Sequence, residues 1–361
     1  MPEKHSKNGY GNSKPLVQSL TFKDWWHLLS RYTSVVESMD TIRTALRIMA
    51  HRGFRHLPVV SNGSLIGMVS AGDLIETFAG REEYKTHFIE EKMAHATLTS
   101  EMKTSGGRIR SSLNNTISSI TNTNPEIIHP NDTILDAITS ISERNIGSLI
   151  IVEGERGEQS ADKEDKIRSS QTALPEKRFN GKLLGIVTLR DLVSILASYS
   201  PFGIRVEDCM SERVATISDR DSIVSAMILM SGKKVRRLPV VATPKGRTLG
   251  NNPVQGMITN KMILRYLESI ISYEMLDLDT ALGQPVKTVM QSSMPMIDPK
   301  EDCGNAAYLM REIGTGGFAV VDSRGLIGVI TERDLIRNIY KKKGIAFFSE
   351  LFEKGNAQMQ I

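Results

Sequence analysis

Apolar and polar residues alternate along the chain with two periods, one typical of helices and one typical of strands. After Asp40, apolar residues at Ala45 and Met49 recur at a four-residue interval, which predicts the buried face of an amphipathic helix. The apolar run LPVV at 57–60 then predicts a short buried strand, and GMVSAGDLI at 67–75 predicts a second strand leading into another helix. This order indicates a small α+β (α/β-like) module and not a helical bundle or a sandwich.

The same pattern occurs four times along the chain, and the four copies align without a gap from the helix to the strand. Each copy starts at an acidic residue, and these residues are Asp40, Asp132, Asp221 and Glu301. The apolar runs that follow are LPVV, LIIV, LPVV and FAVV, at 57–60, 149–152, 238–241 and 318–321. The second blocks are GMVSAGDLI, GIVTLRDLV, GMITNKMIL and GVITERDLI, which start at Gly67, Gly185, Gly256 and Gly328. The chain is therefore predicted to be four tandem βαββα modules.

The positions of the four copies divide the chain into segments. We expect a flexible N-terminal segment at 1–29, repeats at 30–80, 118–197, 206–270 and 284–340, a helical linker at 81–117 and a C-terminal tail at 341–361. The second repeat carries a polar insertion at 153–180, which a loop tip can tolerate. A module of about 55 residues is too small to bury its core well. We therefore expect two pseudo-twofold pairs, of repeats one and two and of repeats three and four.

Composition narrows the class of protein. With 40% hydrophobic and 24% charged residues and no apolar run of roughly 18 residues, a globular protein without a membrane span is predicted. Cys209 and Cys303 are too few for a disulfide framework and belong to no metal-binding motif, so we expect reduced thiols in the cytoplasm. The residues form no recognisable catalytic or metal-ligating constellation, and we expect no enzyme activity, no metal and no required cofactor.

The strand motif LPVV, followed by a block such as GIVTLRDL, resembles the cystathionine beta-synthase (CBS) domain. Four copies in one chain resemble the gamma subunit of AMP-activated protein kinase and stand-alone prokaryotic CBS proteins. This resemblance implies two Bateman modules, each made of two paired CBS domains. It also implies a regulatory, ligand-binding role.

The resemblance implies a set of ribose-binding residues. In this family a Thr or Ser, with the Asp three residues later, holds the ribose hydroxyls of an adenosine ligand in the cleft between paired modules. A carboxylate can accept both hydrogen bonds of a vicinal diol. The matching residues here are Ser70 with Asp73, Thr188 with Asp191, and Thr331 with Asp334. In the third repeat the residue three positions after Thr259 is Met262, which cannot accept a hydrogen bond from a ribose hydroxyl. The alternative is that these residues only cap a helix, and both roles can coexist.

Basic residues precede the apolar strand in the odd repeats only. These positions hold Arg55 and His56 in the first repeat and Arg236 and Arg237 in the third, whereas the even repeats have Gly147, Ser148, Gly316 and Gly317. In the family, basic residues at this position contact ligand phosphates, so the resemblance implies that role for the four basic residues. The glycines would offer room and backbone N–H groups. The alternative is a solvated basic surface.

These residues together predict a regulator that binds AMP, ADP or ATP at up to three sites and transmits occupancy to an effector protein that the sequence does not identify. Two alternatives remain, namely another adenosyl ligand (S-adenosylmethionine or a dinucleotide) and a nucleic-acid-binding or transcriptional scaffold. A sulfonium cation would be repelled by Arg236 and Arg237, and the mild net charge of +4 gives little support to nucleic acid. Four repeats on one chain could close into a monomeric disc, or form a homodimer.

Overall fold

The computed structural model describes residues 21–23, 34–80, 105–154, 181–242, 253–273 and 277–358. Most of the N-terminal segment, most of the linker and the polar insertion lie outside these ranges. Four three-stranded sheets are present in the described ranges, one in each predicted repeat. In each sheet the first strand runs parallel to the second, and the third runs antiparallel to it. The predicted α+β fold of four tandem modules is therefore confirmed.

The first two repeats contain the same five elements in the same order. Repeat 1 consists of β1 (Val36–Glu37), α1 (Ile42–Arg52), β2 (His56–Ser61), β3 (Ser64–Ser70) and α2 (Ala71–Ala79). Repeat 2 consists of β4 (Ile127–Ile128), α5 (Ile134–Arg144), β5 (Ser148–Glu153), β6 (Lys182–Thr188) and α6 (Leu189–Leu196). Between them lie α4 (Ser105–Leu113) and a 3-10 turn, η3 (Ile117–Ile120).

The last two repeats follow the same plan. Repeat 3 consists of β7 (Ile217–Ser218), α8 (Ile223–Lys233), β8 (Arg237–Val241), β9 (Val254–Thr259) and α9 (Asn260–Tyr273). Repeat 4 consists of β10 (Met296–Ile297), α11 (Cys303–Ile313), β11 (Gly317–Asp322), β12 (Gly325–Thr331) and α12 (Glu332–Gln358). Short elements precede these repeats, namely η5 (Ala197–Tyr199), α7 (Val206–Cys209), α10 (Leu278–Gly283) and η6 (Val286–Thr288).

The helices form because their apolar residues lie on one face, and α2, α5 and α6 are also capped at their N-termini. In α1 the buried residues Ile42, Ala45, Leu46 and Met49 follow the three- and four-residue spacing of a helix. The helix ends at Gly53, whose φ of 74° is accessible to glycine at little cost. The strands that follow α1 are buried, which agrees with their unbroken apolar runs.

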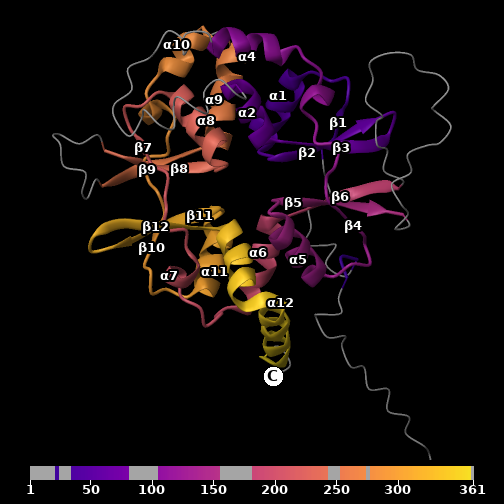
Figure 1. The fold of residues 1–361 in the computed structure, drawn as a ribbon, viewed down its shortest axis with the longest axis vertical. Helices are drawn as coiled ribbons and strands as arrows, with labels where there is room; N and C mark the ends of the chain where they lie inside the picture. The colour runs from indigo at the N-terminus through magenta and orange to yellow at the C-terminus, as the bar shows by residue number, and fades with distance from the viewer. Residues whose placement is uncertain are drawn as a thin grey trace, which may run out of the picture.

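Two kinds of contact hold the four repeats together. Sheets face each other within a pair, since Leu65 of repeat 1 packs with Ile150 and Val152 of repeat 2, and Met257 of repeat 3 packs with Ala319 of repeat 4. Helices join the pairs, because one large core combines repeats 1 and 3 and the other combines repeats 2 and 4. In Figure 1 the repeats accordingly occupy four quadrants, with the sheets in the middle and the helices above and below.

The segment that precedes each repeat packs on the other repeat of its pair. Asn122, ahead of the first strand of repeat 2, exchanges two backbone hydrogen bonds with Met68 in β3 of repeat 1. Gln291, ahead of the first strand of repeat 4, does the same with Met257 in β9 of repeat 3. The reciprocal segments pack on repeats 2 and 4, at Phe22 and Ser211. We call these the crossed segments, and they interlock the two repeats of each pair.

The glycine that starts the second block lies against a crossed segment. A Cβ atom on Gly67 would lie 2.4 Å from the backbone oxygen of Asn122, and one on Gly256 would lie 2.1 Å from that of Gln291. At Gly328 it would lie 2.6 Å from Sδ of Met210. In repeats 1, 3 and 4 glycine is therefore needed at the start of this block so that the neighbouring backbone can pair with the strand.

The C-terminal tail folds back on the protein. The chain bends at Gly344, inside the range of α12, where φ is 71°. Beyond this bend Phe348 and Phe352 are buried in the core of repeats 2 and 4, and the ring of Phe352 lies 5.0 Å from that of Tyr199. None of the helices that the structure describes combines the length and apolar character needed to cross a bilayer.

Candidate functional site

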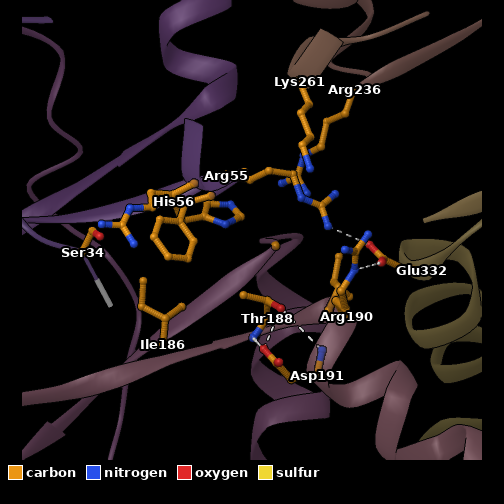
Figure 2. Close-up of a pocket in the computed structure, with 15 residues that line it drawn as sticks. Ser34, Arg55, His56, Ile186, Thr188, Arg190, Asp191, Arg236, Lys261 and Glu332 are labelled. Atoms are coloured by element: carbon orange, nitrogen blue, oxygen red, sulfur yellow. Dashed lines mark hydrogen bonds and ion pairs between the residues drawn. The ribbon is translucent and has the colours of Figure 1, made fainter. Parts of the chain in front are cut away.

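A cavity of about 330 Å³ lies where the four repeats meet. Its walls come mainly from the cleft between repeats 1 and 2, and the other pair contributes three side chains, Arg236, Lys261 and Glu332. Figure 2 shows the hydroxyl and carboxylate of Thr188 and Asp191 at one end and basic side chains at the other. The volume is at the lower end of the range for small-ligand sites, which is about 300 to 1,000 Å³.

Thr188 and Asp191 begin α6 and bind each other. The backbone N–H and the hydroxyl of Thr188 both donate to Oδ2 of Asp191, each at 2.7 Å, and the Asp191 N–H donates back at 3.4 Å. Among the described residues, Oδ1 of Asp191 accepts no hydrogen bond. Burial raises the pKa of Asp191, while its bonds to Thr188 oppose the rise. The helix cap thus leaves one carboxylate oxygen able to accept from a ligand.

The other two predicted Thr or Ser and Asp pairs also form helix caps. Ser70 donates its backbone N–H to Asp73 at 2.7 Å, and Thr331 donates its hydroxyl to Asp334 at 2.6 Å. At Asp334, however, Oδ1 also accepts from the Ser211 hydroxyl at 2.8 Å and from the Asn338 amide at 3.1 Å. Both oxygens of Asp334 are therefore engaged by the protein, and a ribose there would have to displace a crossed segment.

The third repeat has the cap without the carboxylate. The backbone N–H of Met262 donates to the Thr259 hydroxyl at 3.3 Å. Met262 offers no charged acceptor, as the sequence indicates. Of the three carboxylates predicted to bind ribose, the structure brings only Asp191 to the wall of the central cavity.

Basic side chains gather around one carboxylate at the other end of the cavity. Glu332, only 4% exposed, accepts from Nε of Arg190 at 2.9 Å and from Nη2 of Arg55 at 3.3 Å. Burial alone would raise the pKa of Glu332, but the charges of Arg55, Arg190 and Arg237 outweigh it and hold the pKa below its usual value. Arg236 and Lys261 approach the same region (Figure 2). The cavity therefore has more positive than negative charge.

The glycines of the even repeats make room for arginines of repeat 3. A Cβ on Gly147 would lie 2.4 Å from Nη2 of Arg236, and one on Gly316 would lie 2.4 Å from Nη2 of Arg237. From the sequence alone, this room is expected to serve ligand phosphates. The structure instead fills it with guanidinium groups, because the helix contacts that join the pairs bring repeat 3 against repeats 2 and 4.

Burial and crowding of like charges lower the pKa values of the basic groups. Burial and neighbouring guanidinium groups lower the pKa of Arg236 to about 9, and burial is the main cause that lowers the pKa of Arg237 to about 10. Nη1 of Arg237 is buried without a hydrogen-bond partner among the described residues. Burial and nearby arginines also lower the pKa of His56 well below its usual value, so its ring is neutral at pH 7. An anion in the cavity would relieve this electrostatic cost.

Among the cavity residues that the sequence did not predict are two charged ones, Lys261 and Glu332. Lys261 is equivalent to Arg190 and Arg333, each located directly before the fourth residue of a cap, and that shared position could have identified it. Glu332 is acidic where the other repeats have Ala71, Leu189 and Asn260. Its role depends on contacts with two other repeats, which no local pattern contains. Within the described ranges, no three His, Cys, Asp or Glu side chains are grouped so as to hold a metal ion.

Known proteins share both the repeat and its arrangement. The family model described as the CBS domain matches residues 28–80, 117–158, 206–269 and 286–341. An uncharacterised 33.4 kDa protein of the ribosomal RNA operon of Thermofilum pendens is 25% identical over 320 residues, covering 87% of this chain and 90% of its own. An uncharacterised protein of Methanocaldococcus jannaschii is 31% identical over 194 residues, covering 52% of this chain and 44% of its own.

A solved structure extends the comparison to three dimensions. It is that of another Methanocaldococcus jannaschii protein, described as a proposed archaeal homologue of g-AMPK. It superposes with a TM-score of 0.65 at 20% identity and covers 86% of this chain and 98% of its own. The arrangement of all four repeats is therefore shared with that protein.

Proposed function

The chain belongs to the CBS domain family, and on that premise we propose that it is a regulatory protein that binds an adenosine nucleotide in the central cavity and transmits its occupancy to a partner protein. One observation carries the proposal. The cavity offers a carboxylate oxygen at one end and an excess of cations at the other. A nucleotide carries a ribose diol at one position and phosphates further along, so the diol can bind the carboxylate while the phosphates bind the cations.

The residues divide into two binding roles. Oδ1 of Asp191 accepts from the ribose hydroxyls, while Thr188 fixes the carboxylate through Oδ2. Arg55, Arg236 and Lys261 bind phosphate, and a charged hydrogen bond of this kind contributes about 1.5 to 3 kcal/mol. His56, being neutral, contributes at most an N–H donor. The ligand is AMP, ADP or ATP, and no covalent step is assigned to the chain.

The regulatory step follows from the origin of the side chains. Arg236 and Glu332 reach the cavity from repeats 3 and 4, although the cleft belongs to repeats 1 and 2. A ligand there contacts both pairs and favours the relative position that it fits. Coupling of this kind typically contributes 1 to 3 kcal/mol, which is enough to change the affinity for an effector protein by about 5- to 150-fold.

The two alternative ligands fit the cavity less well. S-adenosylmethionine carries a sulfonium cation, which Arg55 and Arg236 would repel. Nucleic acid is bound by cations spread along a surface, whereas the basic side chains here are gathered inside one cavity. We also propose a cytoplasmic location, because Cys209 and Cys303 are buried thiols that form no disulfide.

Isothermal titration of the protein with AMP, ADP, ATP and S-adenosylmethionine tests the proposal. We expect saturable binding of at least one adenosine nucleotide and weaker or no binding of S-adenosylmethionine. No heat and no thermal stabilisation with any of the three nucleotides would reject an adenosine-nucleotide sensor. Preferred binding of S-adenosylmethionine would keep the cavity as a binding site but reject the assignment of its cations to phosphate.

Substitution of Arg236 separates phosphate binding from structural support. Arg236→Gln should weaken AMP binding by about tenfold, since it removes a charged hydrogen bond. It should also raise the thermal midpoint of the ligand-free protein, because burial and three neighbouring arginines already disfavour the charged form of this residue. Titration calorimetry measures the first effect and thermal denaturation the second.

Arg324→Gln is the matched control for this change. Arg324 is 78% exposed, pairs with Asp322 and lies outside the cavity, so both readouts should stay close to those of the unchanged protein. A lower thermal midpoint with unchanged AMP affinity in Arg236→Gln would contradict the prediction. In that case Arg236 would serve only to pack against Gly147.

A further inference from the structure

Glu332 lies where a ligand phosphate is expected to bind. It is the first residue of α12 in repeat 4, yet its side chain reaches the cleft between repeats 1 and 2. Its two oxygens accept from different repeats, Oε2 from Arg55 at 3.3 Å and Oε1 from Arg190 at 2.9 Å. The protein thus places its own anion on an arginine that the proposed function assigns to phosphate.

The repeat fold does not require an acid at this position. The equivalent residues are Ala71, Leu189 and Asn260, and the three repeats that contain them form the same helix. A carboxylate that is only 4% exposed is costly unless it is paired. The cluster of arginines offsets that cost, so Glu332 and the cavity cations depend on each other.

The position of Glu332 relative to Asp191 determines which part of a bound nucleotide approaches Glu332. In Figure 2 Arg190 lies between the two carboxylates, with Asp191 below it and Glu332 to its right, on the side of the cavity toward Arg55 and Arg236. A nucleotide whose ribose is bound at Asp191 extends its phosphates toward the cations. Each additional phosphate comes closer to Glu332 and competes with it for Arg55 and Arg190. Like charges in such a setting repel strongly.

We propose that Glu332 is a specificity-determining residue that limits the number of phosphates in the bound ligand, so that the cavity favours a nucleoside monophosphate over a triphosphate. The inference rests on the proposed function for the position of the ribose. It adds to that function the selection between ligands that differ only in their phosphates. The carboxylate acts by competition and not by contact with the nucleoside.

The test compares Glu332→Gln with a matched control, Glu76→Gln. Glu76 also forms an ion pair with another repeat, because Nζ of Lys234 lies 2.7 Å from its Oε2, but it lies outside the cavity. Titration of each variant with AMP and ATP gives the ratio of the two affinities. In Glu332→Gln we expect ATP affinity to rise by about tenfold and AMP affinity to change by less than about threefold, because one like-charge contact is relieved. Glu76→Gln should keep the ratio of the unchanged protein.

Inorganic phosphate and tripolyphosphate, read by thermal stabilisation, form a second arm that contains no nucleoside. There, Glu332→Gln should increase stabilisation by tripolyphosphate more than stabilisation by phosphate. If no nucleotide binds, the proposed function fails, and this arm alone decides whether Glu332 limits phosphate number. If the single variant does not fold, Glu332→Asp, which keeps the charge but draws it back from Arg55 and Arg190, should shift the ratio in the same direction by a smaller factor.

Three results separate the outcomes. A lower AMP to ATP affinity ratio in Glu332→Gln supports the inference. Equal gains for AMP and ATP would overturn it while leaving the nucleotide site intact, since Glu332 would then only neutralise charge. An unchanged ratio in both arms would likewise overturn it.

Discussion

Replacing Asp191 by alanine should lower the affinity for AMP by at least about 100-fold. The carboxylate is proposed to accept two charged hydrogen bonds from the ribose, each contributing about 1.5 to 3 kcal/mol, and a loss of 1.4 kcal/mol corresponds to tenfold. Titration calorimetry of AMP and 2′-deoxy-AMP gives the direct measurement. The deoxy ligand should bind the unchanged protein more weakly than AMP, whereas Asp191→Ala should no longer distinguish the two ligands.

Asp136→Ala controls for the loss of a helix cap. Asp136 caps α5 with nearly the same geometry, accepting from the N–H and the hydroxyl of Thr133 at 2.8 and 2.7 Å, but it is exposed and lies outside the cavity. Both variants should lose about 1 kcal/mol of stability from the cap. Only Asp191→Ala should lose affinity. Equal affinities in the two variants would mean that Asp191 caps its helix and does nothing more.

A methyl group on Gly256 should destabilise the protein by about 3 kcal/mol, at the upper end of the range for overpacking. The new Cβ would lie 2.1 Å from the backbone oxygen of Gln291. To relieve this contact, β9 and the crossed segment must separate, and the two 2.9 Å hydrogen bonds between Met257 and Gln291 would be lost. Urea denaturation of Gly256→Ala, followed by circular dichroism, measures the change in stability.

Gly283→Ala is the appropriate comparison. Gly283 ends α10, which precedes the crossed segment at Gln291, and no atom lies within 4 Å of a Cβ built there. Alanine favours helix more than glycine by about 1 kcal/mol, so this variant should be as stable as the unchanged protein or slightly more stable. If Gly256→Ala proved as stable as Gly283→Ala, the close approach of the crossed segment would not be what requires glycine.

The modules could be predicted from the sequence because they are specified locally. The helix spacing of Ala45 and Met49, and the apolar strand at 57–60, depend on residues that are neighbours in the chain. The equivalents in the other repeats obey the same rule, so four sheets with one topology follow. Pairing of the repeats was also predictable, since one small module cannot bury its core alone, but the sequence did not show that the sheets make the contact.

The arrangement between the pairs could not be predicted in this way. The apolar helix faces of all four repeats are similar, so their pattern does not show that repeat 1 meets repeat 3 or that repeat 2 meets repeat 4. The contacts that follow from this arrangement could not be predicted either, namely those of Glu332 with Arg55, Arg236 with Gly147, and Ser211 with Asp334. Each of these contacts joins residues that are far apart in the chain.

The crossed segments set an order for folding during synthesis on the ribosome. Repeat 1 lacks the backbone partner of β3 until residue 122 has been translated, and repeat 3 lacks that of β9 until residue 291 has been translated. The segments that pack on repeats 2 and 4, at Phe22 and Ser211, are translated before those repeats begin. In a nascent odd repeat, one strand edge therefore stays unpaired until the later crossed segment is translated. For a nascent even repeat, the crossed segment that packs on it has already been translated. The growing chain should acquire stable structure in two steps, one for each completed pair.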